Sequence, residues 1–379
     1  MAKAPDIEIP HPRENPRLIG HEAAAQRFME EFTQGKPHHA YLITGAKGIG
    51  KSTLAYHFAR YVLGHGAQAA KVEEAPSMSL FGDEPTPVAS HQSPVTSGLD
   101  MDADSSLFRR VAASSHTDLL ALSPAYDAKK HVEKSTISVD EARKVPDFLS
   151  LTPAEGLWRV VIVDAVDQLT NQAANALLKI LEEPPARAML FLVCHQPAAI
   201  LPTIRSRCRL LKLNAPDESE FAEILNHIAP SIEVHQHAAL YALAGGSAGH
   251  AITLHAEEGL KWYEGWLKAM QPTASAEARQ KFADSAVAVK SPAAWAAIIH
   301  GWRTAMHRIS LHPHTPNGQI LRREEELIAA IAERLTPAQR ADWVEQGNQL
   351  IMQTETFNLD KRYTIRMLAD AGQLDKLAA

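Results

Sequence analysis

The sequence predicts an α/β domain in which helices cover both faces of a parallel sheet, followed by a small helical domain and an all-α C-terminal domain. Over the first 214 residues, apolar β-branched runs alternate with helical patterns. A glycine-rich loop joins the first of these runs to the helix that follows it. After residue 214 the strand patterns stop. We therefore expect domains at 1–214, 215–258 and 259–379.

Composition is ordinary for a soluble globular protein, with 379 residues, 45% hydrophobic and 22% charged. No window approaches twenty uninterrupted apolar residues, and the first residues contain no apolar signal-peptide core. We expect a cytoplasmic protein that does not use a membrane. The formal charge of −6 argues against wrapping nucleic acid by bulk electrostatics, although a local basic patch stays open.

The metal-binding residue types show no ligand pattern. The two cysteines, Cys194 and Cys208, exclude a disulfide framework and a CxxC zinc site. We interpret them as small buried residues of a reducing compartment. The 19 histidines include close pairs without a carboxylate or cysteine at ligand spacing. We expect surface or partly packed histidines and no zinc.

Residues 41–63 have the pattern of a phosphate-binding loop between a strand and a helix, because GxxxxGK[ST] is met at 45–52. Glycines let the loop turn tightly and aim N–H groups inward, at the positive end of the following helix. Lys51 is placed to reach terminal phosphates, and the Ser52 hydroxyl to bind magnesium. A chance glycine-rich turn is the weaker alternative. The candidate nucleotide-binding residues are Gly45, Ala46, Lys47, Gly48, Ile49, Gly50, Lys51, Ser52 and Thr53.

The other elements of the α/β domain follow from apolar runs and from helix start and stop residues. The strand at 158–164 ends in Asp164, which in a P-loop protein would lie beside the magnesium ion. Pro184 and Pro185 end the helix before them, because proline cannot donate the backbone hydrogen bond. We expect strands at 41–44, 118–123, 158–164, 189–194 and 210–213, and helices at about 22–32, 51–63, 140–149, 171–183 and 198–204.

Two segments lack periodicity. Residues 1–15 are predicted to be an extended lead-in that is ordered only when something binds it. Residues 64–105 are predicted to be a flexible insertion, because Pro, Ser, Ala, Gly and acidic residues dominate them. The apolar residues at 78–81 are either a docking motif or an ordinary loop contact.

The C-terminal part is predicted to be entirely helical. Asp217 and Glu220 have the spacing of a capping box, and a Gly-Gly-Ser break at 245–247 separates two helices. Beyond 259 the chain contains apolar stripes without a catalytic constellation, so we expect a helical bundle that serves assembly. The stripes are Trp295, Ile299, Trp302, Met306 and Ile309, and Leu327, Ile328, Ile331 and Leu335.

Four segments resemble AAA+ proteins of the clamp-loader type, which are subunits of bacterial DNA polymerase III. They are residues 20–55, 158–185 with NALLKILEEPP, 201–208 ending in SRC, and 245–251. The similarity covers about 12–256 apart from the insertion. The resemblance implies an AAA+ P-loop domain, a helical lid and a C-terminal collar for oligomerisation. The helical remainder fits the collar by position and composition alone.

The resemblance also implies a function. Gamma/tau motor subunits, a delta subunit and a comparatively rigid stator form a hetero-pentamer that uses ATP to place a sliding clamp on primed DNA. This chain resembles the stator. The SRC arginine, Arg207, is then the arginine finger that acts in trans on the neighbouring motor's nucleotide, an effect on the order of 10³–10⁵ in rate. The alternative is that Arg205, Arg207 and Arg209 are surface charges. Contact with DNA should be sequence-independent and salt-sensitive.

Three departures bear on whether the chain hydrolyses ATP. Ala165 follows Asp164 where motor members have glutamate, and Asp167 is expected to face elsewhere. The polar residue that motor members carry after the next strand is replaced near His195 and Gln196, and Gly249 stands where a lid arginine is expected. We expect ATP and magnesium to be bound without efficient hydrolysis. The zinc cysteines of many stators are absent.

Two alternatives stay open. The first is a gamma/tau-like motor ATPase that uses Lys51, Ser52 and Asp164, with Asp167 in place of the glutamate. The second, a small-molecule P-loop kinase, leaves the SRC segment and the helical bundle unexplained.

Overall fold

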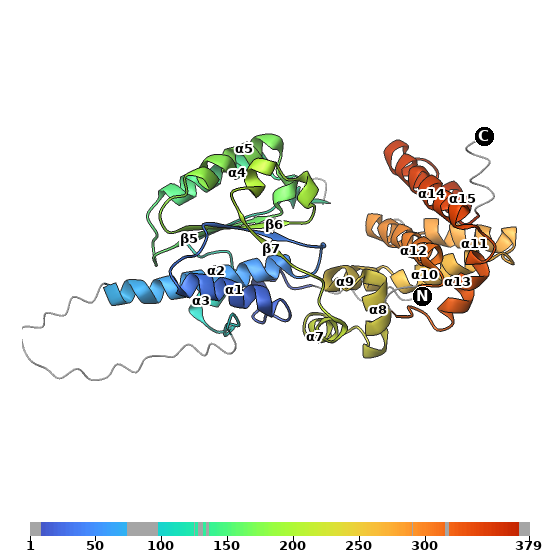
Figure 1. The fold of residues 1–379 in the computed structure, drawn as a ribbon, viewed down its shortest axis with the longest axis horizontal. Helices are drawn as coiled ribbons and strands as arrows, with labels where there is room; N and C mark the ends of the chain where they lie inside the picture. Colours follow the sequence, from blue (N-terminus) through green and yellow to red (C-terminus); the bar gives the residue numbers. More distant parts are fainter. Residues whose placement is uncertain are drawn as a thin grey trace, which may run out of the picture. The chain divides into compact units, whose positions relative to one another are not determined.

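The computed structural model describes residues 9–73, 98–124, 126–127, 132–133, 136–289, 291–314 and 318–370. The chain divides into an α/β unit, residues 10–216, and a helical unit that begins at Asp217 (Figure 1). Within the described residues, every helix is too short or too polar to cross a membrane.

The α/β unit is built on a parallel sheet of five strands in the order β2-β5-β6-β1-β7. Each predicted strand is present, with its ends shifted by at most one residue. In the register of the sheet, Thr44 pairs with Cys194 and Asp164 with Val193, so β1, β5 and β6 end at the same edge. The strands are β1 (Ala40–Thr44), β2 (Leu119–Leu122), β5 (Arg159–Asp164), β6 (Ala188–Cys194) and β7 (Arg209–Lys212).

Alternate residues of these strands enter two separate buried clusters, one on each face of the sheet. Tyr41 and Ile43 pack with apolar residues of α1 and α2, whereas Leu42 packs with residues of α4 and α5. Figure 1 shows α1 and α2 on one side of the sheet and α4 and α5 on the other. The predicted α/β arrangement is therefore confirmed. The helices are α1 (Glu22–Thr33), α2 (Lys51–Glu73), α3 (Ser106–Ala112), α4 (Val139–Ser150), α5 (Asn171–Glu182) and α6 (Pro202–Arg205).

The segment predicted to be a flexible insertion is partly helical. Helix α2 continues through Gly64 to Glu73, so the prediction is wrong for 64–73. From Ala67 onward the Ala, Gln, Lys and Glu residues favour a helix, but the segment has no apolar stripe, which is why periodicity missed it. At the other end, the Ser105 hydroxyl accepts from the Phe108 N–H and caps α3. Residues 74–97, with the apolar residues at 78–81, lie outside the described residues.

A short antiparallel pair was not predicted. Strand β3 (Tyr126–Asp127) pairs with β4 (Val132–Glu133) between β2 and α4. Two residues per strand are too few to produce a periodic signal.

The N-terminal segment is held by a side chain of α2. The buried Arg60 guanidinium donates to the carbonyl oxygens of Arg13 at 2.9 Å and Asn15 at 2.7 Å. Burial lowers the pKa of Arg60 to about 10. The Leu18 N–H donates to Asp100 at 2.8 Å, and residues 12–14 form a short 3-10 helix. The lead-in expected at 1–15 is thus tied down by the chain itself from residue 10 onward, and residues 1–8 lie outside the described residues.

The described part of the helical unit contains no strand, as predicted. The Asp217 side chain accepts from the Glu220 N–H at 2.8 Å, so the predicted capping box is present. One buried cluster contains residues from α7 to α15 and joins the predicted lid to the predicted collar. The helices are α7 (Glu218–Ile228), α8 (His237–Ala244), α9 (Ala248–Ala256), α10 (Gly259–Ala269), α11 (Ala276–Val287), α12 (Pro292–Leu311), α13 (Glu324–Ala332), α14 (Pro337–Phe357) and α15 (Lys361–Leu368).

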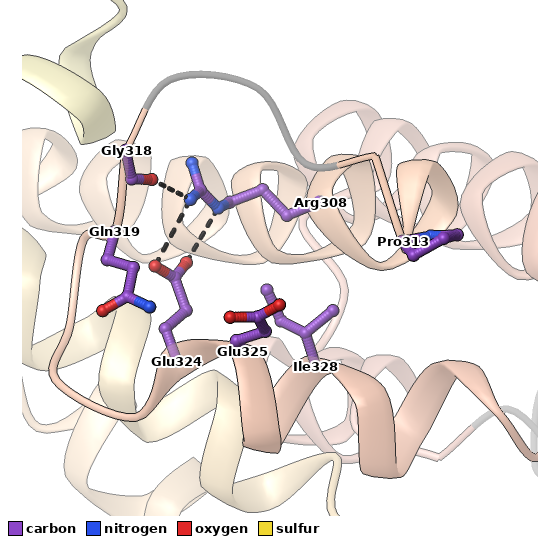
Figure 2. Close-up of a pocket in the computed structure, with 7 residues that line it drawn as sticks. All are labelled: Arg308, Pro313, Gly318, Gln319, Glu324, Glu325 and Ile328. Atoms are coloured by element: carbon purple, nitrogen blue, oxygen red, sulfur yellow. Dashed lines mark hydrogen bonds and ion pairs between the residues drawn. The ribbon is translucent and has the colours of Figure 1, made fainter.

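A buried carboxylate organises one corner of the helical unit (Figure 2). Glu324 forms an ion pair with Arg308, in which Oε1 lies 2.8 Å from Nε. It accepts hydrogen bonds from Arg308 Nη2 at 3.3 Å, from the Ile320 N–H at 2.6 Å and from the Tyr263 hydroxyl. Burial, reinforced by Glu324, raises the pKa of Tyr263. Arg308 and Glu324 line a cavity of about 230 Å³, together with the exposed Glu325. Because the buried charges are paired, this group holds α12, α13 and α10 together.

Candidate functional site

The glycine-rich loop lies between β1 and α2, at the edge of the sheet where β1, β5 and β6 end. Gly45 has φ +152°, and a Cβ atom there would lie 2.8 Å from the Leu213 carbonyl oxygen and 2.7 Å from the Ile49 side chain. Gly48 and Gly50 also have positive φ, at 80° and 98°. Glycine is therefore required by close contact at position 45 and favoured by conformation at 48 and 50.

Lys51 lies at the base of this loop. Its side chain is only 2% exposed, and Nζ donates to the carbonyl oxygens of Gly45 at 2.8 Å and Ala46 at 2.5 Å. These two bonds fix the ammonium and leave one N–H for an anion in the loop. Burial lowers the pKa of Lys51 to about 8, and the negative charge of Asp164 opposes this shift.

His21 holds the loop from outside. Its Nε2 donates to the Ile49 carbonyl oxygen at 2.7 Å, and its own backbone is left-handed, with φ 66°. The N-terminal end of α1 thus supports the loop, a role that we did not predict. The only sequence signal is the Gly-His-Glu step that opens the first predicted helix.

Two carboxylates stand near the lysine. Asp164, the last residue of β5, and Asp167 in the following 3-10 turn both raise the pKa of Lys51 by their charge. Asp167 accepts from the His195 N–H at 2.9 Å. The Cys194 thiol also donates to Asp167, and burial raises the pKa of that thiol to about 12. The expectation that Asp167 faces elsewhere is wrong, because the turn directs it back toward the end of β6.

The neighbouring candidates fit a nucleotide with magnesium. Ser52 and Thr53 are half-buried in the first turn of α2, where backbone N–H groups have no intrahelical partner. Ser52 and Asp164 are the residues that would hold magnesium there, with phosphate oxygens completing its ligands. Within the described residues, there is no group of three or more His, Cys, Asp or Glu side chains that could hold a metal ion by itself.

Arg207 lies two residues after the end of α6. Its Nη2 lies 2.9 Å from Glu182 Oε1, and its Nη1 donates to the Thr203 carbonyl oxygen at 2.9 Å. The side chain stays 35% exposed. Arg209, by contrast, donates to Glu31 at 2.9 Å and belongs to the contact between β7 and α1. The three arginines predicted together as one run thus have different environments, and Arg205 is simply exposed.

The parallel sheet with a glycine-rich loop before α2 defines the class of P-loop α/β proteins. The family described as "DNA polymerase III, delta subunit" matches residues 20–83 and 91–217, which together make up half of the chain. The chain therefore belongs to the DNA polymerase III, delta subunit family, which confirms the resemblance seen in the sequence.

Individual relatives agree with this assignment. The chain is 32% identical over 220 residues to the DNA polymerase III subunit delta' of Pseudomonas aeruginosa, covering 58% of this chain and 56% of the relative. It is 32% identical over 231 residues to the delta' subunit of Escherichia coli, covering 60% and 58%. It is 27% identical over 241 residues to the tau subunit of Salmonella typhimurium, covering 62% and 32%. The matched region thus spans a little over half the length of the delta' relatives.

Similarity to solved structures is weaker. A gamma subunit-related protein of Thermotoga maritima has a TM-score of 0.39 and 18% identity, covering 94% of this chain and 99% of that chain. A match at this level supports no conclusion about function.

Proposed function

We propose that this chain is a delta-prime-type stator of the DNA polymerase III clamp loader, which helps to load the sliding clamp onto primed DNA. Its partners are gamma/tau motor subunits and a delta subunit in a hetero-pentamer. The chain binds ATP with magnesium at residues 45–53 and Asp164, hydrolyses it inefficiently, and donates Arg207 to the nucleotide of the neighbouring motor.

One observation carries this proposal: the well-formed loop lies beside a carboxylate, Asp167, that is already hydrogen-bonded, while Arg207 stays accessible. Lys51 is fixed at the base of the loop by two carbonyl oxygens. Ala165, where a motor would have glutamate, is fully buried. Asp167 is engaged by His195 and Cys194. These contacts favour a site that holds nucleotide over one that activates water.

The chemistry of each residue follows from its position. The loop N–H groups and Lys51 bind phosphate oxygens, and bound magnesium would neutralise part of the phosphate charge. The Arg207 guanidinium would act outside its own chain, where it stabilises charge that develops on the transferring phosphoryl group. Contact with primed DNA would go to the phosphates and depend on salt.

The first test measures ATP turnover of the ring assembled from this chain, motor and delta subunits, clamp and primed DNA. Replacing Arg207 by alanine should lower turnover by the share of one motor site without changing assembly. Arg205→Ala is the matched control, because Arg205 is an exposed arginine of the same run. Unchanged turnover with Arg207→Ala would refute the finger role.

The second test measures binding of a fluorescent ATP analogue with magnesium to the isolated chain. Lys51→Ala should abolish binding, whereas Lys47→Ala, which changes an exposed lysine of the same loop, should weaken it less.

The intact loop also favours a gamma/tau-like motor as the second candidate. Hydrolysis by the isolated chain at a motor-like rate, abolished by Lys51→Ala, would establish that candidate instead.

A further inference from the structure

The structure brings together two segments that the sequence places 25 positions apart: the acidic end of α5 and the arginine that follows α6. Glu182 is the last residue of α5, and its Oε1 lies 2.9 Å from Arg207 Nη2. A carboxylate at a helix C-terminus is opposed by the helix dipole. The negative charge of Glu182 is therefore unfavourable at this position of the helix, and the positive charge of Arg207 offsets this unfavourable interaction.

The Arg207 guanidinium is held from two sides. From its own segment, the Thr203 carbonyl oxygen accepts from Nη1 at 2.9 Å, and the Ser206 hydroxyl lies 3.4 Å from the same nitrogen. From α5, Glu182 holds Nη2. Since a guanidinium carries five N–H donors, these contacts leave donors available for a phosphate.

The α5 side of this contact is rigid. Leu181, next to Glu182, is buried against the sheet, and its carbonyl oxygen accepts from His39 Nε2 at 3.1 Å at the start of β1. The backbone that carries Glu182 is thus fixed to the sheet, while α6 is a helix of only four residues. Of the two segments that carry the ion pair, α5 is therefore held more firmly than the segment that follows α6.

We propose that Glu182 is a positioning residue for Arg207: it holds the guanidinium in the orientation in which the finger is presented to the neighbouring nucleotide. This inference rests on the proposed function of Arg207. The ion pair is half-exposed, at 35% for Arg207 and 49% for Glu182, so solvent screens the carboxylate charge. The ion pair contributes mainly by orienting the Arg207 side chain. Because the side chain is already ordered, it loses less rotamer freedom when it binds the neighbouring nucleotide.

The test uses the assembled ring with clamp and primed DNA, and compares Glu182→Ala, Glu182→Gln and Glu183→Ala. Glu183 is the matched control, because it is the adjacent exposed glutamate. Glu182→Ala should lower turnover about two- to five-fold at the one motor site that Arg207 serves, the effect of losing a half-exposed ion pair. The kcat of the whole ring should therefore fall by no more than in Arg207→Ala, with KM unchanged. Glu182→Gln should keep most of the rate, because its amide oxygen still accepts from Arg207, and Glu183→Ala should match the native ring.

A double variant separates positioning from a general effect on the fold. In the Arg207→Ala background, Glu182→Ala should cause no further loss of kcat. Ring assembly, followed by size-exclusion chromatography, should be the same for every variant. An unchanged or raised kcat in Glu182→Ala would overturn the inference, as would a Gln variant as slow as the Ala variant. If Arg207→Ala does not change kcat, the finger role of Arg207 is refuted. If Arg207→Ala lowers kcat but Glu182→Ala does not, only the positioning role of Glu182 is refuted.

Discussion

The Asp167 carboxylate accepts a hydrogen bond from the His195 backbone N–H at 2.9 Å. This bond joins the turn after β5 to the end of β6, at the edge of the sheet that carries the glycine-rich loop. The Cys194 thiol donates to the same carboxylate. Asp167 therefore has a fixed structural task beside Lys51, which distinguishes it from a carboxylate that is free to accept a proton from water.

Asp167→Asn should leave the chain's own ATP turnover within about two-fold of the native value, because a general base contributes on the order of 10²–10⁴ and Asp167 is not placed to act as one. The retained amide oxygen can still accept from His195. Turnover of bound ATP in a single-turnover experiment measures the effect. A fall of a hundredfold or more would instead support the motor function, in which Asp167 activates water.

The stability of the α/β unit should depend on the pH through His57, which is fully buried on α2. Its Nδ1 donates to the Leu99 carbonyl oxygen at 2.9 Å. Burial, reinforced by the Arg60 charge, lowers the pKa of His57 to about 3, whereas in the unfolded chain it is about 6.5. Between these values the unfolded state binds the extra proton, so stability is fully present above about pH 6.5 and is lost as the pH falls toward 3.

From pH 6.5 to 5, His57 alone should reduce the unfolding free energy by about 2 kcal/mol. Hydrogen exchange in β1 reports this change for the α/β unit separately from the helical unit. His57→Gln removes the titrating group and keeps a hydrogen-bond donor. Protection of β1 from hydrogen exchange should therefore vary less with pH in this variant than in the native chain. A variant with the same pH dependence as the native chain would assign the effect to other groups.

What the sequence could predict was local. The strands, the glycine-rich loop and the capping box each depend on residues within a few positions of one another, and the structure contains all of them. Asp167 was misplaced because a 3-10 turn at Val166–Gln168 redirects its side chain. The contacts of Glu182 with Arg207 and of Arg60 with Asn15 join distant segments, so no periodic pattern encodes them.

The buried pair of Glu324 and Arg308 should be essential for the stability of the helical unit (Figure 2). Glu324→Ala would remove the carboxylate that is paired with Arg308, which is 5% exposed, and should cost about 3–5 kcal/mol. Glu325 is the adjacent, exposed glutamate, and Glu325→Ala should change the free energy of unfolding by about 0.5 kcal/mol or less. Urea unfolding followed by tryptophan fluorescence reports on this unit, which contains Trp266 and Trp302. Equal effects of the two variants would contradict a structural role of the ion pair.

Gly347, inside α14, should not tolerate alanine although alanine favours helices. A Cβ atom there would overlap with Cη2 and Cζ2 of Trp302. Trp302 is fully buried and its Nε1 donates to the Leu368 carbonyl oxygen at 3.2 Å, so the indole cannot move aside. The gain in helix propensity is about 1 kcal/mol, whereas such overpacking costs about 1–3 kcal/mol or more. With such an overlap the clash dominates, and we expect Gly347→Ala to destabilise the unit by about 2 kcal/mol.

A double-mutant cycle tests the cause. Trp302→Phe removes the two ring atoms that the new Cβ would meet, at the cost of a cavity and a hydrogen bond. In that background Gly347→Ala should be neutral or stabilising, because only the flexible end of the Leu368 side chain, whose Cδ2 lies 3.0 Å from the new Cβ, then opposes the propensity gain. Urea unfolding of the four chains gives the coupling free energy, which should exceed about 1 kcal/mol. Additive effects would show that contact with Trp302 is not what requires glycine at 347.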